Sequence, residues 1–215
     1  MKVAIIVFPG TNCDIDTLKA CKQMKWDVET LWHEEENLSS FNLVILPGGF
    51  SYGDYLSAGR LAKFSPVIKA LRSYIENKSG FTLGICNGFQ ILCEAGFLPG
   101  ALSSNDNLKF ISDYTSLSFK KSEKTINITL PIAHKEGCFF ADKKDIEKIN
   151  NENMIFLTYN INPNGSMLDI AGLYDRKNRI MGMMPHPERA AFKELGSTDG
   201  LEIFKFIEEE CCVNR

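Results

Sequence analysis

The sequence predicts an α/β fold with a mainly parallel central sheet, helices on both faces and added antiparallel strands. In the first half of the chain, short apolar and β-branched runs alternate with helical segments, which is typical of a parallel sheet. In the second half, strand-like runs follow one another through short polar connections, which favours hairpins or antiparallel strands. The chain has 215 residues and no linker-like segment, so we expect one domain over residues 1–215.

The first half supplies four expected strands. They are apolar runs, two of which stop at Pro-Gly pairs, and they span residues 2–8, 28–32, 42–46 and 81–85. Between and after them we expect helices over residues 14–25, 61–75 and 87–95. The middle helix depends on apolar residues at steps of three and four, which predict one continuous amphipathic helix through Leu61, Phe64, Ile68, Leu71 and Ile75.

The second half supplies five more strand-like segments and a closing helix. The segments lie near Leu117 and over residues 126–130, 155–159, 170–174 and 180–184. The helix is expected over residues 199–210, because Leu201, Phe204 and Ile207 fall on one face.

Composition and charge exclude several classes of function. Lys and Arg number 24 against 27 Asp and Glu, so the net charge of -3 leaves no basic excess for nucleic acid. No apolar run approaches the ~20 residues that a membrane span needs, and none resembles a secretory signal. The seven cysteines include no C-x-x-C pair and the three histidines lie far apart, which argues against a disulfide framework and a metal site. We expect a reduced, cytoplasmic protein.

One motif has the pattern of a nucleophile elbow. Gly84-Ile85-Cys86-Asn87-Gly88 joins an expected strand to an expected helix, and the glycines permit a sharp backbone turn. The turn would expose Cys86 at the carboxyl end of the sheet, at a helix N-terminus that favours the reactive thiolate. Cys86 is therefore the candidate nucleophile.

A cysteine nucleophile needs a base, and His186 is the best placed of the three histidines. Prolines on both sides restrict its backbone, and Glu188 follows two residues later, where its carboxylate can orient the ring. His33 lies in a run of glutamates and is expected to belong to a solvated charged segment, whereas the role of His134 stays open.

An acyl transfer also needs N–H groups that stabilise the negatively charged oxygen of the intermediate. Gly48 and Gly49 follow a parallel strand and can offer such groups. The Asn87 N–H is the natural second donor.

Motifs in this order resemble the class I (triad) glutamine amidotransferase family. The motifs are Pro47-Gly48-Gly49, Gly84-Ile85-Cys86-Asn87-Gly88-Phe89-Gln90 and His186-Pro187-Glu188. Longer stretches narrow the resemblance to the family of glutaminase subunits of phosphoribosylformylglycinamidine synthase, in de novo purine biosynthesis. These stretches span residues 8–14, 47–56, 131–134, 162–166 and 183–189.

The resemblance implies a flavodoxin-like glutamine amidotransferase fold and the hydrolysis of L-glutamine to glutamate and ammonia. It implies that Cys86 attacks the side-chain amide, that His186 moves the proton and that Glu188 orients His186. It also implies that Gly48, Gly49 and Asn87 supply oxyanion donors, whereas Gln90 helps to hold the substrate.

The resemblance also implies partners. The ammonia would pass to a synthetase subunit, which uses ATP and Mg to convert formylglycinamide ribonucleotide to formylglycinamidine ribonucleotide, in a complex with a small accessory subunit. No cofactor is expected in this chain, which has no G-x-x-x-x-G-K-[ST] loop. The exposed Tyr52–Leu56 region suggests an interface near the active edge.

Two other functions fit part of this pattern. A related flavodoxin-like cysteine hydrolase often has histidine directly after the nucleophile, where this chain has Asn87. A catalytically silent binding protein does not need the intact set of Cys86, His186 and Glu188. The chain departs from the family pattern at Lys135, where a small residue is expected, so the roles of His134 and Glu136 stay open.

Overall fold

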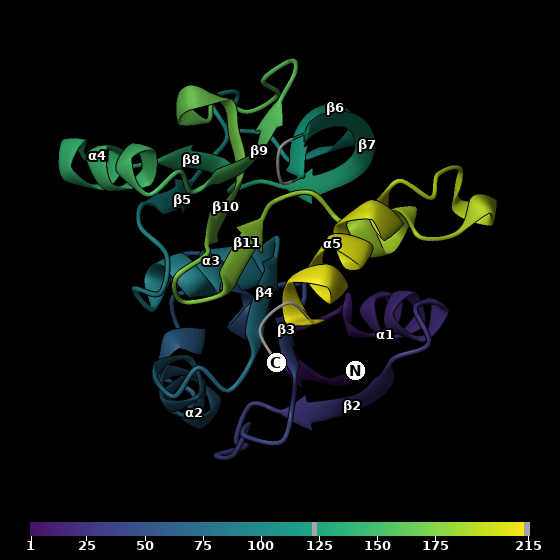
Figure 1. Cartoon of the computed structure of the whole chain (residues 1–215). Coiled ribbons are helices and arrows are strands. Elements are labelled where there is room, and N and C mark those ends of the chain that lie inside the picture. The colour runs from purple at the N-terminus through teal and green to yellow at the C-terminus, as the bar shows by residue number, and fades with distance from the viewer. Residues whose placement is uncertain (122–123, 213–215) are drawn as a thin grey trace.

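The computed structural model describes residues 1–121 and 124–212 (Figure 1). Its main sheet is built from β1 (Lys2–Val7), β2 (Asp27–Trp32), β3 (Leu43–Leu46), β4 (Phe81–Ile85), β6 (Ile111–Lys121), β7 (Lys124–His134), β9 (Ile155–Tyr159), β10 (Ile170–Asp175) and β11 (Ile180–Met183). The order across the sheet is β2-β1-β3-β4-β11-β10-β9-β6-β7. A separate two-stranded ladder pairs β5 (Ala101–Ser103) with β8 (Cys138–Phe140).

Helices cover both faces of this sheet. The α-helices of the described residues are α1 (Asp14–Gln23), α2 (Pro66–Glu76), α3 (Asn87–Glu94), α4 (Lys143–Asn151) and α5 (Gly200–Cys212). In Figure 1, α1 and α5 lie on one side of the parallel strands, and α2 and α3 lie on the other. This arrangement confirms the predicted α/β class.

The parallel half of the sheet comprises β1, β2, β3, β4 and β11. Every residue of β3 and β4 is buried, as expected of central strands covered on both faces. Leu46 of β3 pairs with Gly84 of β4, so the two strands end close together at their carboxyl ends. The segments that follow these strands therefore meet at one edge of the sheet.

The antiparallel half comprises β6, β7, β9 and β10, and it begins where β10 pairs antiparallel with β11. The longest hairpin pairs β6 with β7, from Ile111 opposite His134 to Lys121 opposite Lys124. The added antiparallel strands that the sequence predicts are thus confirmed.

The continuous helix expected over residues 61–75 is wrong at its start. Residues 62–64 form a 3-10 turn, Ser65 is extended with φ -66° and ψ 145°, and α2 begins at Pro66. Pro66 explains the break, because a proline disfavours the helical conformation in the residue before it yet suits the first turn of a helix. Phe64 is consequently 76% exposed instead of packed against the sheet.

Helix α4 and the β5–β8 ladder lie outside the elements that the sequence predicts. The signals for α4 are weak in this charged segment. The Asp142 carboxylate accepts a hydrogen bond from the Asp145 N–H at 2.8 Å, which caps the helix, and Ile146 and Ile149 lie one turn apart.

None of the helices in the described part of the chain is long and apolar enough to cross a membrane. The seven cysteines form no disulfide within the described residues, and five of them are buried. Most of them therefore act as small apolar residues of the interior.

Candidate active site

Cys86 stands at the sharp turn between β4 and α3. Its backbone has φ 49° and ψ -103°, a conformation that residues with a side chain rarely adopt. The Cys86 N–H donates to the Met183 carbonyl at 2.7 Å, and α3 begins at the next residue. The predicted strand–turn–helix context is confirmed, and the thiol lies at the N-terminal end of α3, where the helix dipole stabilises an anion.

The two glycines of the motif let α3 pack closely on the sheet. A Cβ atom at Gly84 would lie 2.7 Å from the backbone of Gly88, and a Cβ atom at Gly88 would overlap the Leu46 carbonyl. No side chain fits at either position, so these glycines fix the place of the thiol.

His186 and Glu188 form a close, buried pair. The distance from His186 Nδ1 to Glu188 Oε1 is 2.6 Å, and each residue is 1% exposed. The His186 N–H donates to the Pro131 carbonyl of β7 at 2.8 Å, which anchors the segment to the antiparallel half. The predicted contact is present, but Glu188 reaches the ring through a 3-10 turn over Pro187–Ala190 and not through an extended chain.

The surroundings of His186 favour its charged form. Burial by itself lowers the pKa of His186, but the Glu188 carboxylate and then the Cys86 sulfur oppose this effect and raise the pKa well above its usual value. Its Nε2 has no hydrogen-bond partner among the described residues. Glu188 therefore holds the His186 ring through Nδ1, and Nε2 stays available for a ligand.

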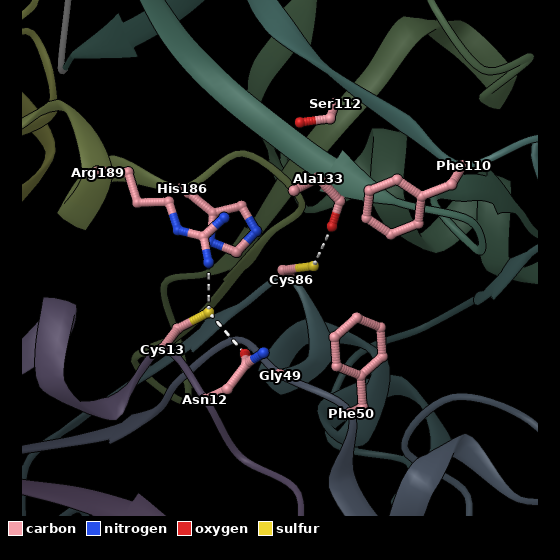
Figure 2. Close-up of a pocket in the computed structure, with 10 residues that line it drawn as sticks. All are labelled: Asn12, Cys13, Gly49, Phe50, Cys86, Phe110, Ser112, Ala133, His186 and Arg189. Atoms are coloured by element: carbon pink, nitrogen blue, oxygen red, sulfur yellow. Dashed lines mark hydrogen bonds between the residues drawn. The ribbon is translucent and has the colours of Figure 1, made fainter. Parts of the chain in front are cut away.

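A cavity of about 240 Å³ contains both Cys86 and His186. Figure 2 shows Cys86 at its centre, with His186, Arg189 and Cys13 on one side and Phe50 and Phe110 on the other. The lining residues are Asn12, Cys13, Gly49, Phe50, Cys86, Phe110, Ser112, Ala133, His186 and Arg189. The Cys86 Sγ lies 3.7 Å from the Ala133 carbonyl oxygen.

Cys13 is a second thiol beside His186. Arg189 Nη2 donates to Cys13 Sγ at 3.0 Å, and the thiol contacts Asn12 Oδ1 at 3.3 Å. Ligand atoms of Cys13, His186 and Glu188 lie within 4.8 Å of one another, a spacing that a metal ion could bridge. The guanidinium on the sulfur and the existing His186–Glu188 bond both disfavour a bound cation at this spacing.

The three expected oxyanion donors differ in their positions. Gly49 lines the cavity with Cys86, whereas Gly48 is packed so closely that a Cβ atom there would lie 2.7 Å from His186 Cε1 and 3.0 Å from Cys13 Sγ. Asn87 is the first residue of α3, where backbone N–H groups have no intrahelical acceptor. Gly49 and Asn87 thus have positions suited to oxyanion binding, and Gly48 also makes room for the imidazole.

A second cavity, of about 280 Å³, adjoins the first at Cys86. The second cavity is lined by Gly49, Phe50, Asp54, Ala58, Cys86, Gln90, Phe110, Ala133, His134, Lys135 and Glu136. Gln90 Nε2 donates to the Glu136 carbonyl, and Gln90 Oε1 accepts from Asn87 Nδ2 at 3.0 Å. Gln90 is thus held at the cavity wall, where a substrate-binding role stays a prediction.

Sequence reasoning missed several lining residues. Arg189 directly follows Glu188, and that adjacency was its only signal. Phe110 and Ser112 come from the start of β6 and have no local pattern. His33 is half-buried beside the exposed Glu34 and Glu36, as predicted for a solvated segment, but its ring also stacks on Phe8, and its Nδ1 lies 3.1 Å from Tyr52 Oη.

Comparison with known proteins relates this chain to glutamine amidotransferases, in agreement with the motifs of its sequence. Residues 1–199 match the family described as the CobB/CobQ-like glutamine amidotransferase domain. The chain is 49% identical over 211 residues to phosphoribosylformylglycinamidine synthase subunit PurQ of Prochlorococcus marinus subsp. pastoris, which covers 93% of this chain and 94% of that protein.

Solved structures agree with the family match. A chain in the structure of PurLQS from Thermotoga maritima matches with a TM-score of 0.88 at 34% identity, over 97% of both chains. A glutamine amidotransferase from Thermotoga maritima shares the fold at 18% identity, with a TM-score of 0.56 over 99% of this chain and 92% of that one. These similarities confirm the predicted fold class and the predicted resemblance.

Proposed function

The chain belongs to the CobB/CobQ-like glutamine amidotransferase family, and from that premise we propose that it is the glutaminase subunit of a phosphoribosylformylglycinamidine synthase. It hydrolyses L-glutamine to glutamate and ammonia, and the ammonia serves de novo purine biosynthesis. The observation that carries this proposal is the presence of Cys86 and His186 in one cavity, with the Glu188 carboxylate bound to the His186 ring. The 49% identity to the PurQ subunit of Prochlorococcus marinus supports it.

In the proposed reaction, the Cys86 thiolate attacks the carbon of the glutamine side-chain amide. His186 donates its proton to the leaving nitrogen, ammonia departs, and a γ-glutamyl thioester remains on Cys86. His186 then accepts a proton from water, which attacks the thioester and releases glutamate. Glu188 holds the ring and stabilises its charged form.

Each tetrahedral intermediate places negative charge on the former amide oxygen. The N–H groups of Gly49 and Asn87 are proposed to bind that oxygen, with Gly48 as a further donor or as the residue that makes space for His186. Gln90, held by Asn87 and by the Glu136 carbonyl, is proposed to contact the substrate.

The ammonia is proposed to pass to a synthetase subunit that converts formylglycinamide ribonucleotide to formylglycinamidine ribonucleotide, and a small accessory subunit completes the complex. ATP and Mg belong to the synthetase in this proposal, and this chain needs no cofactor of its own. Cysteines without disulfides suit the reducing cytoplasm that the sequence predicts.

The synthetase is proposed to contact the loop at residues 52–56, beside the second cavity. Tyr55 and Leu56 are 73% and 78% exposed, so two adjacent large side chains are accessible to a partner at this loop. Tyr55→Ala and Leu56→Ala should weaken assembly in a titration against the synthetase, whereas Ile161→Ala, at a residue of matched 82% exposure, should not. Unchanged assembly in the loop variants would remove this interface.

The test of function is glutamate release from L-glutamine, with and without the synthetase, ATP and formylglycinamide ribonucleotide. We expect strong release only in the complete mixture, and none with Cys86→Ala. Release that persists in Cys86→Ala would show that another group is the nucleophile. No release by the wild type under any condition would favour a different cysteine hydrolase or a catalytically silent binding protein.

A further inference from the structure

Cys13 stands at the N-terminal end of α1, but its side chain does not cap that helix. The N-cap position usually takes Ser, Thr, Asp or Asn, whose side-chain oxygen accepts a backbone N–H group of the first turn. Within the described residues the Cys13 side chain makes no such bond to α1, and Cys13 is only 2% exposed. It lines the first cavity instead, on the side of His186 and Arg189 (Figure 2). The side chain therefore belongs to the active site and not to the helix.

The hydrogen bonds of Cys13 fix the position of its sulfur. The thiol donates to Asn12 Oδ1 at 3.3 Å, and the sulfur accepts from Arg189 Nη2 at 3.0 Å. Arg189 is itself held, because its Nε lies 3.6 Å from Asp16 Oδ2 in the first turn of α1. A thiol that donates its proton to Asn12 keeps its lone pairs for groups on its other sides. The sulfur is therefore an acceptor with a fixed position.

This sulfur lies beside the ring of His186. A Cβ atom at Gly48 would lie 3.0 Å from Cys13 Sγ and 2.7 Å from His186 Cε1, so the sulfur and the ring meet over the same glycine. Glu188 Oε1 holds one ring nitrogen at 2.6 Å, but the ring can still swing about a single hydrogen bond. A second contact removes that freedom, and a reacting side chain needs such support to keep its orientation.

The charge of His186 agrees with this contact. Burial lowers the pKa of His186, the Glu188 carboxylate and the Cys86 sulfur raise it, and the contact with Cys13 adds to the rise. His134, at the end of β7, is also close enough to interact with the charge of His186. Cys13 thus helps to stabilise the imidazolium, which is the form that gives a proton to the leaving nitrogen.

We propose that Cys13 is a positioning residue of the glutaminase reaction. Its sulfur, fixed by Arg189, holds the His186 ring in the orientation in which Nε2 is available to Cys86 and to the substrate amide. Cys13 forms no covalent bond with the substrate, and Arg189 acts through the sulfur. This inference rests on the proposed function and adds a supporting residue to the reacting set.

The experiment measures glutamate release from L-glutamine by the complete complex with the synthetase. Cys13→Ala removes the sulfur, whereas Cys13→Ser restores an acceptor on a shorter bond. Cys93→Ala is the matched control, because Cys93 is also a buried thiol, 8% exposed, but lines neither of the two cavities. Thermal unfolding of each variant checks that it folds.

We expect Cys13→Ala to lower kcat by about 10- to 100-fold and to leave KM within about twofold, because a misplaced base slows the reaction more than it weakens binding. Cys13→Ser should stay within about fivefold of the wild-type kcat, and Cys93→Ala should match the wild type.

The ring of His186 gives a second readout, which a purely structural role of Cys13 would not move. In NMR of the full chain with isotope-labelled histidine, the pKa of His186 should be lower in Cys13→Ala than in the wild type. In Cys13→Ser it should lie between the two, and in Cys93→Ala it should not change.

A double-mutant cycle tests the role of Arg189. Arg189→Met keeps a side chain of similar length but removes the donor to the sulfur, and it should lower kcat by about 3- to 30-fold. If Arg189 acts through Cys13, this loss should disappear in a chain that already carries Cys13→Ala. Losses that multiply in the double variant would show that the two residues act separately and would overturn their coupling.

Three further results would overturn the inference. One is a kcat of Cys13→Ala within about twofold of the wild type, one is an unchanged titration of His186, and one is a serine variant no more active than the alanine variant. If the wild type releases no glutamate, the proposed function fails as well. If the wild type is active and any of the three results is found, only the inference fails.

Discussion

The parallel and antiparallel halves of the sheet contribute different parts of the active site. The parallel half supplies Cys86 and Gly49, which stand on tight turns directly after β4 and β3. The antiparallel half supplies the opposite wall. There the Ala133 carbonyl lies near Cys86 Sγ, and the Pro131 carbonyl holds the His186 N–H.

This difference shows how the chemistry is divided. The place of the nucleophile is fixed by local packing within one strand–turn–helix unit. The place of the proposed base depends on a contact between distant segments, because the His186 N–H donates to the carbonyl of Pro131, which lies 55 residues earlier in the sequence. Changes in the parallel half should therefore act on the reacting atom itself, and changes at the junction of the halves should act on its orientation and charge.

The largest effect is expected where the base meets its carboxylate. Glu188→Gln should lower kcat by about 10³-fold, because the amide cannot stabilise the His186 imidazolium. The pKa of His186 should fall, since burial is then unopposed. In the wild type the raised pKa gives stability that is complete below the ordinary histidine pKa and is lost as pH rises through the folded value.

Glu188→Gln should lose that dependence, which urea unfolding from about pH 6 to about pH 9 measures. The exposed Glu152→Gln variant is the matched control. An unchanged kcat in Glu188→Gln would contradict the proposed role of the pair.

The next effect tests the packing between the halves. Gly48→Ala should displace the imidazole, because the new methyl group would lie 2.7 Å from His186 Cε1. We expect kcat to fall by about 10- to 100-fold, as for other small misplacements of a reacting group. Steady-state kinetics measures this loss, and thermal unfolding should show that the variant still folds.

Gly96→Ala is the control for this change. Gly96 has φ 73°, and a Cβ atom there would have no neighbouring atom within 4 Å, so alanine meets only backbone strain. It should lose about 1 kcal/mol of stability and no activity. A Gly48→Ala enzyme as active as the control would show that the glycine serves another purpose.

A smaller effect concerns the backbone of the parallel half. Both Cys86→Ala and Cys86→Gly remove the thiol, but only glycine accepts φ 49° without strain. Cys86→Gly should therefore be more stable than Cys86→Ala by about 1 kcal/mol in urea unfolding. Equal stability, or a more stable alanine variant, would show that the elbow stores no strain.

The smallest effect lies in the second cavity. Because Asp54 has a raised pKa of about 6, its contribution to stability is present below its ordinary pKa and is lost as pH rises through about 6. Asp54→Asn should therefore match the wild type near about pH 4 and unfold about 1–3 °C higher above about pH 7. A lower unfolding temperature at both pH values would mean that Asp54 stabilises the free protein.

The sequence predicts the parallel half better than the antiparallel half for a physical reason. Cys86 and its glycines are adjacent in sequence, and His186 and Glu188 are two residues apart, so local patterns reveal them. Asp54 and Glu136 meet only because the β3 loop and the end of the β6–β7 hairpin converge in the fold. No local pattern encodes such a meeting.

Effects that the average pattern does not show also explain the two errors in the predicted secondary structure. The expected helix over residues 61–75 follows the apolar period correctly, but the single constraint of Pro66 on Ser65 outweighs that period. Helix α4 was missed because tertiary packing of Ile149, which is fully buried, stabilises a segment that is otherwise charged. In both cases a specific contact or steric rule outweighs the average pattern.

In the proposed reaction Cys86, and not the nearby Cys13, forms the covalent intermediate. The direct test is peptide mass spectrometry of the complete complex after acid quenching during turnover with L-glutamine. We predict a γ-glutamyl adduct on the peptide that contains Cys86, and its absence in Cys86→Ala. An adduct on Cys13, or steady glutamate release without any cysteine adduct, would show that Cys86 is not the nucleophile.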